Sequence, residues 1–376
     1  MSWRYEPAET DAPRVLLVSL RRLQPQVSRG LRFEFEDHIQ ALDAAELVTP
    51  DGPGIASPLV RRAARVAERV VPGVTGLLAR ERLRLAPRYD LVFVALETLS
   101  DLPLLQPLGW LLRRAVVSAC FVDEVWRKGL RDRTGELRLL RPFDQVLVGT
   151  AGSVEEVQAR SGRPCRYLAP SVDAAALCPY PAPLARTIDL YAMGRRSPRT
   201  HQALLELAGR RRWLYLYDTL DSSRMPSHQA HRRLLGSLLR RTRYFLAYPG
   251  KVDTASETGG QQEIGFRYFE GAAAGAILVG EPPATPWYQQ LFDWPDTIVP
   301  LPWDSTEPEQ ALAPLEADAP RVERMRHANV AGSLLRHDHV YRWAEVLQSV
   351  GLPGTAAMEQ RRLELRRLAE LARAGA

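Results

Sequence analysis

Short apolar runs recur along this 376-residue chain and alternate with stretches of helical periodicity. The runs lack polar alternation, which is typical of parallel strands covered on both faces. Strands separated by helical stretches indicate βα units. The predicted strands are residues 14–20, 90–96, 116–122, 144–148, 188–193, 213–217, 244–247, 276–279 and 296–300. We therefore expect an α/β protein built on parallel sheets.

Helical spacing of apolar residues predicts the helices between these strands. Residues 34–47 and 337–347 are each expected to form one helix. Residues 59–85 are basic and amphipathic, and Pro72 with Gly73 divides them into two helices. Two interpretations remain open for this segment: a solvated helix on a sheet, or an interfacial helix resting on anionic lipid. Residues 228–243 predict a strongly basic helix with a solvated face.

A proline-rich stretch, residues 163–183, interrupts the pattern and predicts the connection between two domains. The chain is long enough for two domains of ordinary size. We place an N-terminal domain at 1–170, a linker at 171–186, a second domain at 187–335 and C-terminal helices at 336–376.

Composition is that of an ordinary globular protein, with 45% hydrophobic and 25% charged residues. No apolar run approaches the roughly 18 residues of a membrane-spanning helix. The charged N-terminus lacks the apolar core of a signal peptide. We therefore expect a cytoplasmic protein, with peripheral membrane contact through residues 59–85 as an option.

The net charge is +6, and nearly all positive charge is arginine, since Lys128 and Lys251 are the only lysines. This balance fits anionic partners such as nucleotides. The basic residues are scattered rather than gathered in one stripe with aromatics, so nucleic acid is not expected as a partner. Cys120, Cys165 and Cys178 have no metal spacing, and the chain has no Asp-x-Asp pair. The sequence therefore predicts no metal site.

The richest chemistry lies in residues 259–282, which predict a turn, a short helix and a buried strand. Arg267 and Glu270 are three apart and are neighbours on a helix surface, and Gly275 ends that helix. A helix N-terminus attracts phosphate, and arginine can bind two phosphate oxygens at once. This arrangement suits a nucleotide diphosphate. The alternative is an ordinary helix–strand unit with a surface Arg–Glu pair.

The order Arg267-Tyr268-Phe269-Glu270, followed by small residues and Gly275, resembles the donor-binding segment of GT-B glycosyltransferases of families 1 and 4, with most similarity to the CgeB-like branch. A related group with a Glu-x7-Glu pair has its first glutamate where this chain has Gln262, and Glu263 follows. Two further points of resemblance are a Pro-x-x-Val-Asp-like linker segment, residues 170–173, and the His-to-Arg spacing of 337–342.

The resemblance implies two Rossmann-like domains that face each other across a cleft, with C-terminal helices crossing back to the first domain. It also implies that a basic residue in the glycine-led loop after strand 188–193 binds the donor diphosphate. The donor-binding candidates are Arg195, Arg196, Arg199, Lys251, Glu263, Arg267 and Glu270.

Candidate catalytic residues lie in the first domain. Asp123 follows a buried strand, and ligands of open parallel sheets gather at the carboxyl ends of strands. The resembling family commonly has an aspartate here, and the alternative is a helix N-cap. His38 is the second candidate, because neutral histidine can accept a proton near pH 7. If the reaction inverts the sugar, one of them is the base; if it retains, no base is required.

The function implied is that of a metal-independent glycosyltransferase without a cofactor, which moves a sugar from a nucleotide-diphosphate donor to a hydroxyl of a sugar, lipid or small molecule. The alternative is a non-catalytic nucleotide- or glycan-binding protein of the same fold. A third hypothesis, a 2-epimerase, requires a close acid/base pair that the sequence does not display. The absence of a Gly-x-Gly-x-x-Gly turn argues against a dinucleotide-dependent redox enzyme.

Overall fold

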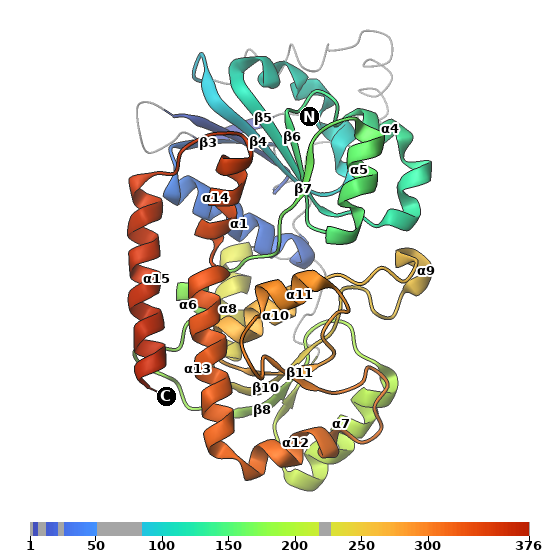
Figure 1. Cartoon of the computed structure of the whole chain (residues 1–376), viewed down its shortest axis with the longest axis vertical. Coiled ribbons are helices and arrows are strands. Elements are labelled where there is room, and N and C mark those ends of the chain that lie inside the picture. Colours follow the sequence, from blue (N-terminus) through green and yellow to red (C-terminus); the bar gives the residue numbers. More distant parts are fainter. Residues whose placement is uncertain (1–2, 7–12, 22–25, 51–84, 218–226, 376) are drawn as a thin grey trace. The chain divides into compact units, whose positions relative to one another are not determined.

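The chain divides into two compact units, each with its own sheet (Figure 1). The computed structural model describes residues 3–6, 13–21, 26–50, 85–217 and 227–375. Apart from Leu85, the basic segment 59–85 lies outside the described residues. Unit 1 comprises Met1–Ala169, Arg224–His228 and Trp343–Met358, and unit 2 comprises Pro170–Ser223, Gln229–Arg342 and Glu359–Ala376.

Unit 1 is built on a seven-stranded sheet in the order β1-β3-β2-β4-β5-β6-β7. Its strands are β1 (Trp3–Glu6), β2 (Val15–Ser19), β3 (Ala45–Pro50), β4 (Tyr89–Thr98), β5 (Ala115–Glu124), β6 (Gln145–Val148) and β7 (Cys165–Tyr167). Only the edge strand β1 is antiparallel to its neighbour. Because the strand order reverses between β2 and β4, the carboxyl ends of these two strands mark the place where open α/β sheets bind ligands.

Helices cover both faces of this sheet. They are α1 (Gly30–Leu42), α4 (Thr134–Arg138), α5 (Val154–Ser161), the later part of α14 (His339–Ser349) and the 3₁₀ helices η1 (Val27–Arg29), η2 (Leu99–Arg114), η3 (Arg127–Asp132) and η4 (Ala151–Ser153). Leu137 of α4 and Val157 of α5 share one core with the strands. On the other face, Phe35 of α1 and Trp343 of α14 both contact the Phe93 ring edge-on.

The prediction of one helix over residues 34–47 was wrong at its end. Helix α1 stops at Leu42, and strand β3 begins at Ala45. Asp43 takes an extended conformation, and its carboxylate accepts hydrogen bonds from Arg14 at 2.7 Å and from Trp343 at 3.0 Å. Contacts with residues far away in the sequence therefore end the helix where its own periodicity continues.

Unit 2 is built on a five-stranded, fully parallel sheet in the order β12-β11-β10-β8-β9. Its strands are β8 (Ile188–Tyr191), β9 (Tyr215–Leu216), β10 (Thr242–Ala247), β11 (Ile277–Gly280) and β12 (Ile298–Pro300). The order reverses between β8 and β10. All five of these strands were predicted, and the α/β fold class is confirmed.

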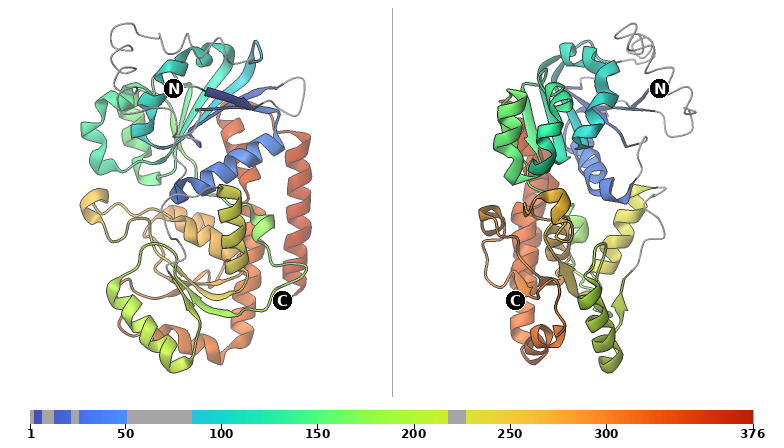
Figure 2. Two further views of the ribbon diagram at one scale, coloured as in Figure 1. Left: turned by 180° about the vertical axis from the view of Figure 1, so that it is seen from behind. Right: turned by 90° about the vertical axis from the view of Figure 1, so that its right-hand side faces the viewer.

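Helices of unit 2 cover both faces of its sheet: α7 and α12 pack on one face, and α10 packs on the other (Figure 2). They are α6 (Ala174–Leu177), α7 (Pro198–Arg211), α8 (His228–Leu239), α9 (Ala255–Thr258), α10 (Phe266–Ala273), α11 (Pro286–Leu291), α12 (Pro308–Ala317), α13 (Ala319–Arg336) and α15 (Ala356–Ala374). A glycine lets α10 approach the sheet, because a Cβ at Gly271 would lie 2.5 Å from Leu278 and 2.6 Å from Phe245.

Candidate functional site

The predicted donor-binding residues of unit 2 follow β8 and β10, the two strands between which the order of the sheet reverses. After β8 the chain turns at Gly194 with φ of +87°, a conformation that favours glycine. Arg195 then pairs with Asp253 at 2.9 Å. Arg199, the second residue of α7, is exposed and makes no hydrogen bond or ion pair with any residue that the structure describes.

The guanidinium of Arg196 lies over the ring of Tyr217, 5.4 Å from its centroid. Arg195 and Arg196 therefore each have a partner within unit 2, whereas Arg199 keeps its charge toward solvent. A ligand that binds Arg195 must compete with Asp253.

Arg267 connects the loop after β8 with helix α10. Its Nε donates to the carbonyl of Met193 at 3.3 Å, and its Nη1 donates to Glu270 on the same helix. The guanidinium also lies close to Gly194, since a Cβ at that residue would be 3.7 Å from Nη2 of Arg267. The Arg267 side chain keeps 27% of its surface exposed, so the guanidinium is fixed by the protein and still accessible.

Glu270 is buried rather than on the helix surface as the sequence predicted, with only 2% of its surface exposed. Its carboxylate lies between Arg267 and Arg232, a residue of α8. Burial favours the neutral acid, but the two guanidinium groups outweigh burial and hold the pKa of Glu270 below its usual value. The carboxylate therefore orients two arginines, and both of its oxygens are already engaged.

The prediction of a basic helix over residues 228–243 with a solvated face was wrong at its end and at Arg232. Helix α8 ends at Leu239, and residues Thr242–Ala247 form β10 instead. Arg232 is itself buried against Glu270. The sequence offered no signal for this pair, because its two members are 38 positions apart.

Lys251 and Glu263 lie in two loop segments that are linked by a backbone hydrogen bond. The amide of Gly250 donates to the carbonyl of Glu263 at 3.0 Å, and the Nζ of Lys251 pairs with Glu257 at 3.0 Å. The buried Glu263 carboxylate accepts from Gln261 at 2.6 Å. This loop pair follows β10 and leads directly to the start of α10.

The N-terminus of α10 has no side-chain cap. Gly265 occupies the N-cap position without a side-chain hydrogen bond, and the first turn has no acidic residue. Amide N–H groups at such an end lack intrahelical partners, and the helix dipole adds partial positive charge. Together with Arg267 in the first turn, this end of α10 is suited to bind an anion.

Asp123 of unit 1 lies at the carboxyl end of β5 and caps no helix. Strand β5 continues through Glu124, and the N-cap of η3 is Trp126, so the N-cap interpretation was wrong. No described residue donates a hydrogen bond to the Asp123 carboxylate, and the nearest cation is Nη1 of Arg32 at 3.6 Å. Burial raises the pKa of Asp123 to about 7, although Arg32 opposes the shift.

His38 lies on the same helix as Arg32 and directs its Nδ1 at the backbone carbonyl of Glu34, 3.0 Å away. Its neighbour Asp37 makes the stronger polar contacts. Asp37 bonds Arg21 at 2.7 Å and His228 at 2.7 Å, and both residues help to lower its pKa against the effect of burial. The sequence did not predict a role for His228, which joins unit 1 from a distant part of the chain.

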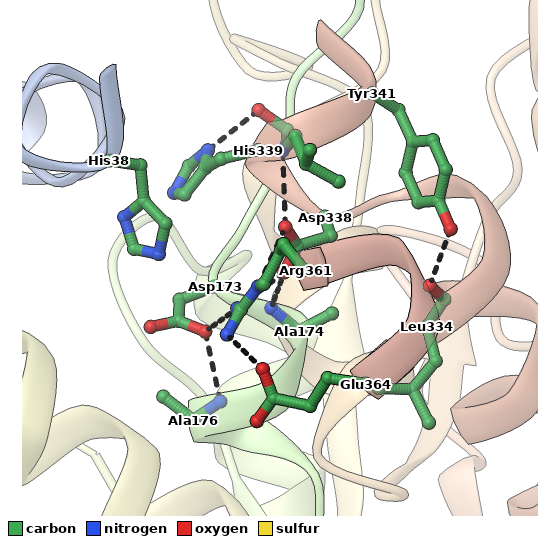
Figure 3. A network of polar contacts seen from close by, with 12 residues as sticks. His38, Asp173, Ala174, Ala176, Leu334, Asp338, His339, Tyr341, Arg361 and Glu364 are labelled. Carbon is green, nitrogen blue, oxygen red and sulfur yellow. Dashed lines mark hydrogen bonds and ion pairs between the residues drawn. The ribbon is translucent and has the colours of Figure 1, made fainter. Parts of the chain in front are cut away.

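The linker segment 170–173 and the C-terminal segment 337–342, both cited for the family resemblance, meet inside unit 2. Figure 3 shows Arg361 of α15 between Asp173 and Asp338, at 2.6 and 2.7 Å. Asp338 also accepts the amide of Ala174 at 3.1 Å, and His339 bonds Ser171 at 2.8 Å. These motif residues therefore fasten two distant chain segments to α15.

The described ranges contain no group of three or more His, Cys, Asp or Glu side chains placed to hold a metal ion. Nor does any helix in them have the length and apolar character needed to cross a membrane.

Residues 196–348 match a protein-family model described as "Glycosyl transferase-like". The matched segment contains the carboxyl-end loops of unit 2, including Arg196, Lys251, Glu263, Arg267 and Glu270. No curated protein matches the chain.

Several solved structures share the fold. HepE of Anabaena in complex with UDP-glucose is 12% identical, with 90% of this chain and 99% of that chain covered and a TM-score of 0.51. An alpha-glucosyltransferase in complex with UDP and DNA containing an HMU base is 10% identical, with 90% and 100% covered and a TM-score of 0.53. An alpha-glucosyltransferase in complex with UDP and DNA containing a central A:G mismatch is 11% identical, with 90% of this chain and 100% of that chain covered and a TM-score of 0.56.

These identities are low, so the likeness to solved structures establishes the fold alone. The chain has the α/β fold of GT-B glycosyltransferases, as the sequence resemblance implied, whereas the CgeB-like branch and the facing cleft stay predictions. Over residues 196–348 the chain is similar to glycosyl transferase-like proteins.

Proposed function

We propose that the protein is a glycosyltransferase whose unit 2 binds the diphosphate of a nucleotide sugar and whose unit 1 binds a hydroxyl acceptor. The observation that carries the proposal is the position of Arg267, in the first turn of the uncapped helix α10 and beside the loop after β8. This is where open α/β sheets bind ligands, and it lies inside the segment similar to glycosyl transferase-like proteins. The UDP and UDP-glucose bound by the structural neighbours support the donor class.

In the transfer, the bond between the anomeric carbon and the diphosphate oxygen breaks, and the electron pair stays on the diphosphate. Arg267 and the α10 amides are placed to stabilise that negative charge. Glu270, whose other oxygen is bound by Arg232, fixes the Arg267 guanidinium, so little reorganisation is needed when the charge develops. We propose that these fixed groups serve in place of a metal, in line with the absence of an Asp-x-Asp pair from the sequence.

The acceptor hydroxyl forms the new bond to the anomeric carbon and must lose its proton. In an inverting reaction, Asp123 accepts this proton. Geometry favours Asp123 over His38, because Asp123 lies at the carboxyl end of β5 and its carboxylate receives no hydrogen bond from the described residues. The Nδ1 of His38 is engaged by the backbone of its own helix.

Thermal unfolding with a panel of nucleotide-diphosphate sugars tests donor binding. A ligand at 100 times its dissociation constant stabilises the folded protein by about 2.7 kcal/mol. We expect a shift with at least one UDP- or GDP-sugar, and loss of that shift in Arg267→Gln. Arg210→Gln is the matched control, because Arg210 is an exposed arginine of unit 2 whose one ion-pair partner among the described residues is Glu309. An equal ligand shift in Arg267→Gln and the wild type would contradict the proposed donor site.

Turnover separates an enzyme from a non-catalytic binder of the same fold. Release of free nucleotide diphosphate from the donor, with and without candidate acceptors, is the measurement. We expect release that is unaffected by EDTA. Donor binding without any release would instead identify the binding protein.

A further inference from the structure

The carboxyl edge of the unit 1 sheet holds a buried cation without hydrogen bonds. The Arg32 side chain is 3% exposed, and its Nε, Nη1 and Nη2 are all buried and make no hydrogen bond to any described residue. Native proteins satisfy the great majority of buried donors, so a buried guanidinium with none of its nitrogen atoms bonded calls for an explanation. Leaving charged donors buried and unbonded costs stability, so this arrangement needs a reason.

Neighbouring carboxylates do not supply that partner. Arg29, one helical turn earlier, occupies Asp101 with two hydrogen bonds of 3.2 and 3.3 Å and contacts Glu97 at 2.6 Å. Asp101 also accepts the amides of Glu97 and Thr98. Within the described part of the chain, Asp123 is the one carboxylate paired with Arg32, and their 3.6 Å separation exceeds hydrogen-bonding distance.

Asp123 can occupy this position because the residue packed against it, Gly149, has no side chain. A Cβ at Gly149, just after β6, would lie 2.3 Å from the Asp123 carbonyl oxygen and 2.6 Å from its Oδ1. The Asp123 side chain remains 15% exposed, more than Arg32. The Asp123 carboxylate, which accepts no hydrogen bond from the described residues, therefore lies beside the three unbonded nitrogen atoms of Arg32. The carboxylate is the more solvent-exposed of the two groups.

The charge around this pair decides which class of ligand fits. Arg32 and Arg29 are the cations that act on Asp123, and Glu97 and Glu124 are the anions. With Asp101, which binds Arg29, and Asp123 itself, the cluster contains four carboxyl groups and two guanidinium groups. An anionic ligand such as a lipid phosphate or a nucleic acid would meet excess negative charge, whereas a neutral hydroxyl group both donates and accepts.

We propose that the acceptor is a neutral carbohydrate that presents two adjacent hydroxyl groups to unit 1, one accepting hydrogen bonds from Arg32 and the other donating to Asp123. The proposal rests on the proposed function, since the hydroxyl on Asp123 is the one that attacks the donor sugar. Adjacent ring hydroxyls match the spacing of a donor and an acceptor that stand side by side without touching. Arg32 is then the residue that selects a sugar over a lone alcohol.

Saturation-transfer NMR of the full chain with neutral methyl hexopyranosides and disaccharides tests this without the donor. We expect binding of at least one neutral sugar, and weaker binding of its uronic acid and 6-phosphate counterparts. Loss of a hydrogen bond to a charged group predicts about 10- to 100-fold weaker binding in Arg32→Gln and in Asp123→Asn. Arg160→Gln is the control, since Arg160 is a partly exposed arginine of unit 1 paired with Glu156.

Stability supplies a second measurement that does not depend on finding the right sugar. Arg32→Met replaces a buried charge without hydrogen bonds by an apolar side chain. At pH 5, where Asp123 is protonated and needs no cation because its pKa is about 7, we expect an unchanged or higher melting temperature together with loss of sugar binding. A clear fall in melting temperature would show that Arg32 serves the fold and would overturn the proposal. Binding of only anionic sugars, no binding of any neutral sugar at millimolar concentration, or wild-type sugar affinity in Arg32→Gln would also overturn it. None of these results affects the donor shift that tests the proposed function.

Discussion

Trp343 donates its indole N–H to the carboxylate of Asp43 at 3.0 Å, across 300 positions of sequence. Both side chains are buried, and Arg14 binds the same carboxylate at 2.7 and 2.8 Å. This contact places part of α14 inside unit 1, beside the end of α1. It also explains why the chain leaves the helical conformation at Asp43.

Replacing Trp343 by Phe removes the N–H donor while keeping an aromatic ring against Phe93. We expect unit 1 to lose about 1–3 kcal/mol, because a buried charged acceptor loses one of its partners and the smaller ring leaves space. Urea unfolding followed by fluorescence and circular dichroism measures this. Trp287→Phe, at a site 39% exposed, should leave the midpoint nearly unchanged. Equal midpoints for Trp343→Phe and wild type would refute a structural role for the bond.

Apart from β3 and β7, the parallel strands were predicted, because their apolar runs are continuous and both faces are covered. The strand β11 is such a case, since Ile277–Gly280 is buried at every position. β3 and the end of α1 were not predictable, because Asp43 owes its conformation to Arg14 and Trp343. Local periodicity contains no information about partners that are distant in the sequence.

The candidate site residues also differ in whether local sequence spacing could predict them. The neighbourhood of Arg267 and Glu270 followed from helical spacing, and their hydrogen bond is present. Arg232 and Arg32 were missed, because a buried arginine in a chain rich in arginine looks like any other until its burial is known. Only the spatial arrangement of Glu270 and Asp123 singles these two arginines out.

Arg361 holds two carboxylates, and removing it should destabilise unit 2 strongly. Arg361→Ala leaves Asp338, which is fully buried, without its cation. We expect a loss of about 3–5 kcal/mol, the range for an uncompensated buried charge. Thermal unfolding measures the effect. Arg362→Ala is the matched control on the next position of α15, where the pair with Glu359 is surface-exposed and is expected to contribute about 0–1 kcal/mol. Similar shifts in both variants would contradict the assigned role of Arg361.

Asp123 predicts the pH dependence of transfer. Burial raises its pKa to about 7, and a base must be ionised to accept a proton, so kcat/KM should fall tenfold per pH unit below about pH 7. Arg32 opposes the shift, so Arg32→Gln should move this limb to higher pH. Asp123→Asn should remove the limb along with most activity. A wild-type limb near pH 4 would contradict the raised pKa, and a limb that persists in Asp123→Asn would assign the titration to another group.

The same residue predicts a dependence of stability on pH with a defined sign. The folded pKa lies above the ordinary value of about 3.9, so the folded state binds the proton more tightly. This contribution to stability is fully present below about pH 4 and is lost as pH rises through about 7. In the difference between wild type and Asp123→Asn, the free energy of unfolding should therefore fall from pH 4 to 7. A rising difference over that range would contradict the raised pKa.

Gly149 offers a test of Asp123 that leaves its chemistry unchanged. A methyl group at this position would lie 2.3 Å from the Asp123 carbonyl oxygen, so Gly149→Ala must displace the end of β5. We expect transfer to fall by at least about 10-fold, since a small displacement of a catalytic group is costly, while the nucleotide-sugar thermal shift persists because its residues belong to unit 2. Gly135→Ala, where an added Cβ meets nothing within 4 Å, is the control and should be neutral or slightly stabilising. Full transfer activity in Gly149→Ala would show that the position of Asp123 does not limit the reaction, and the base would then have to be sought elsewhere in unit 1.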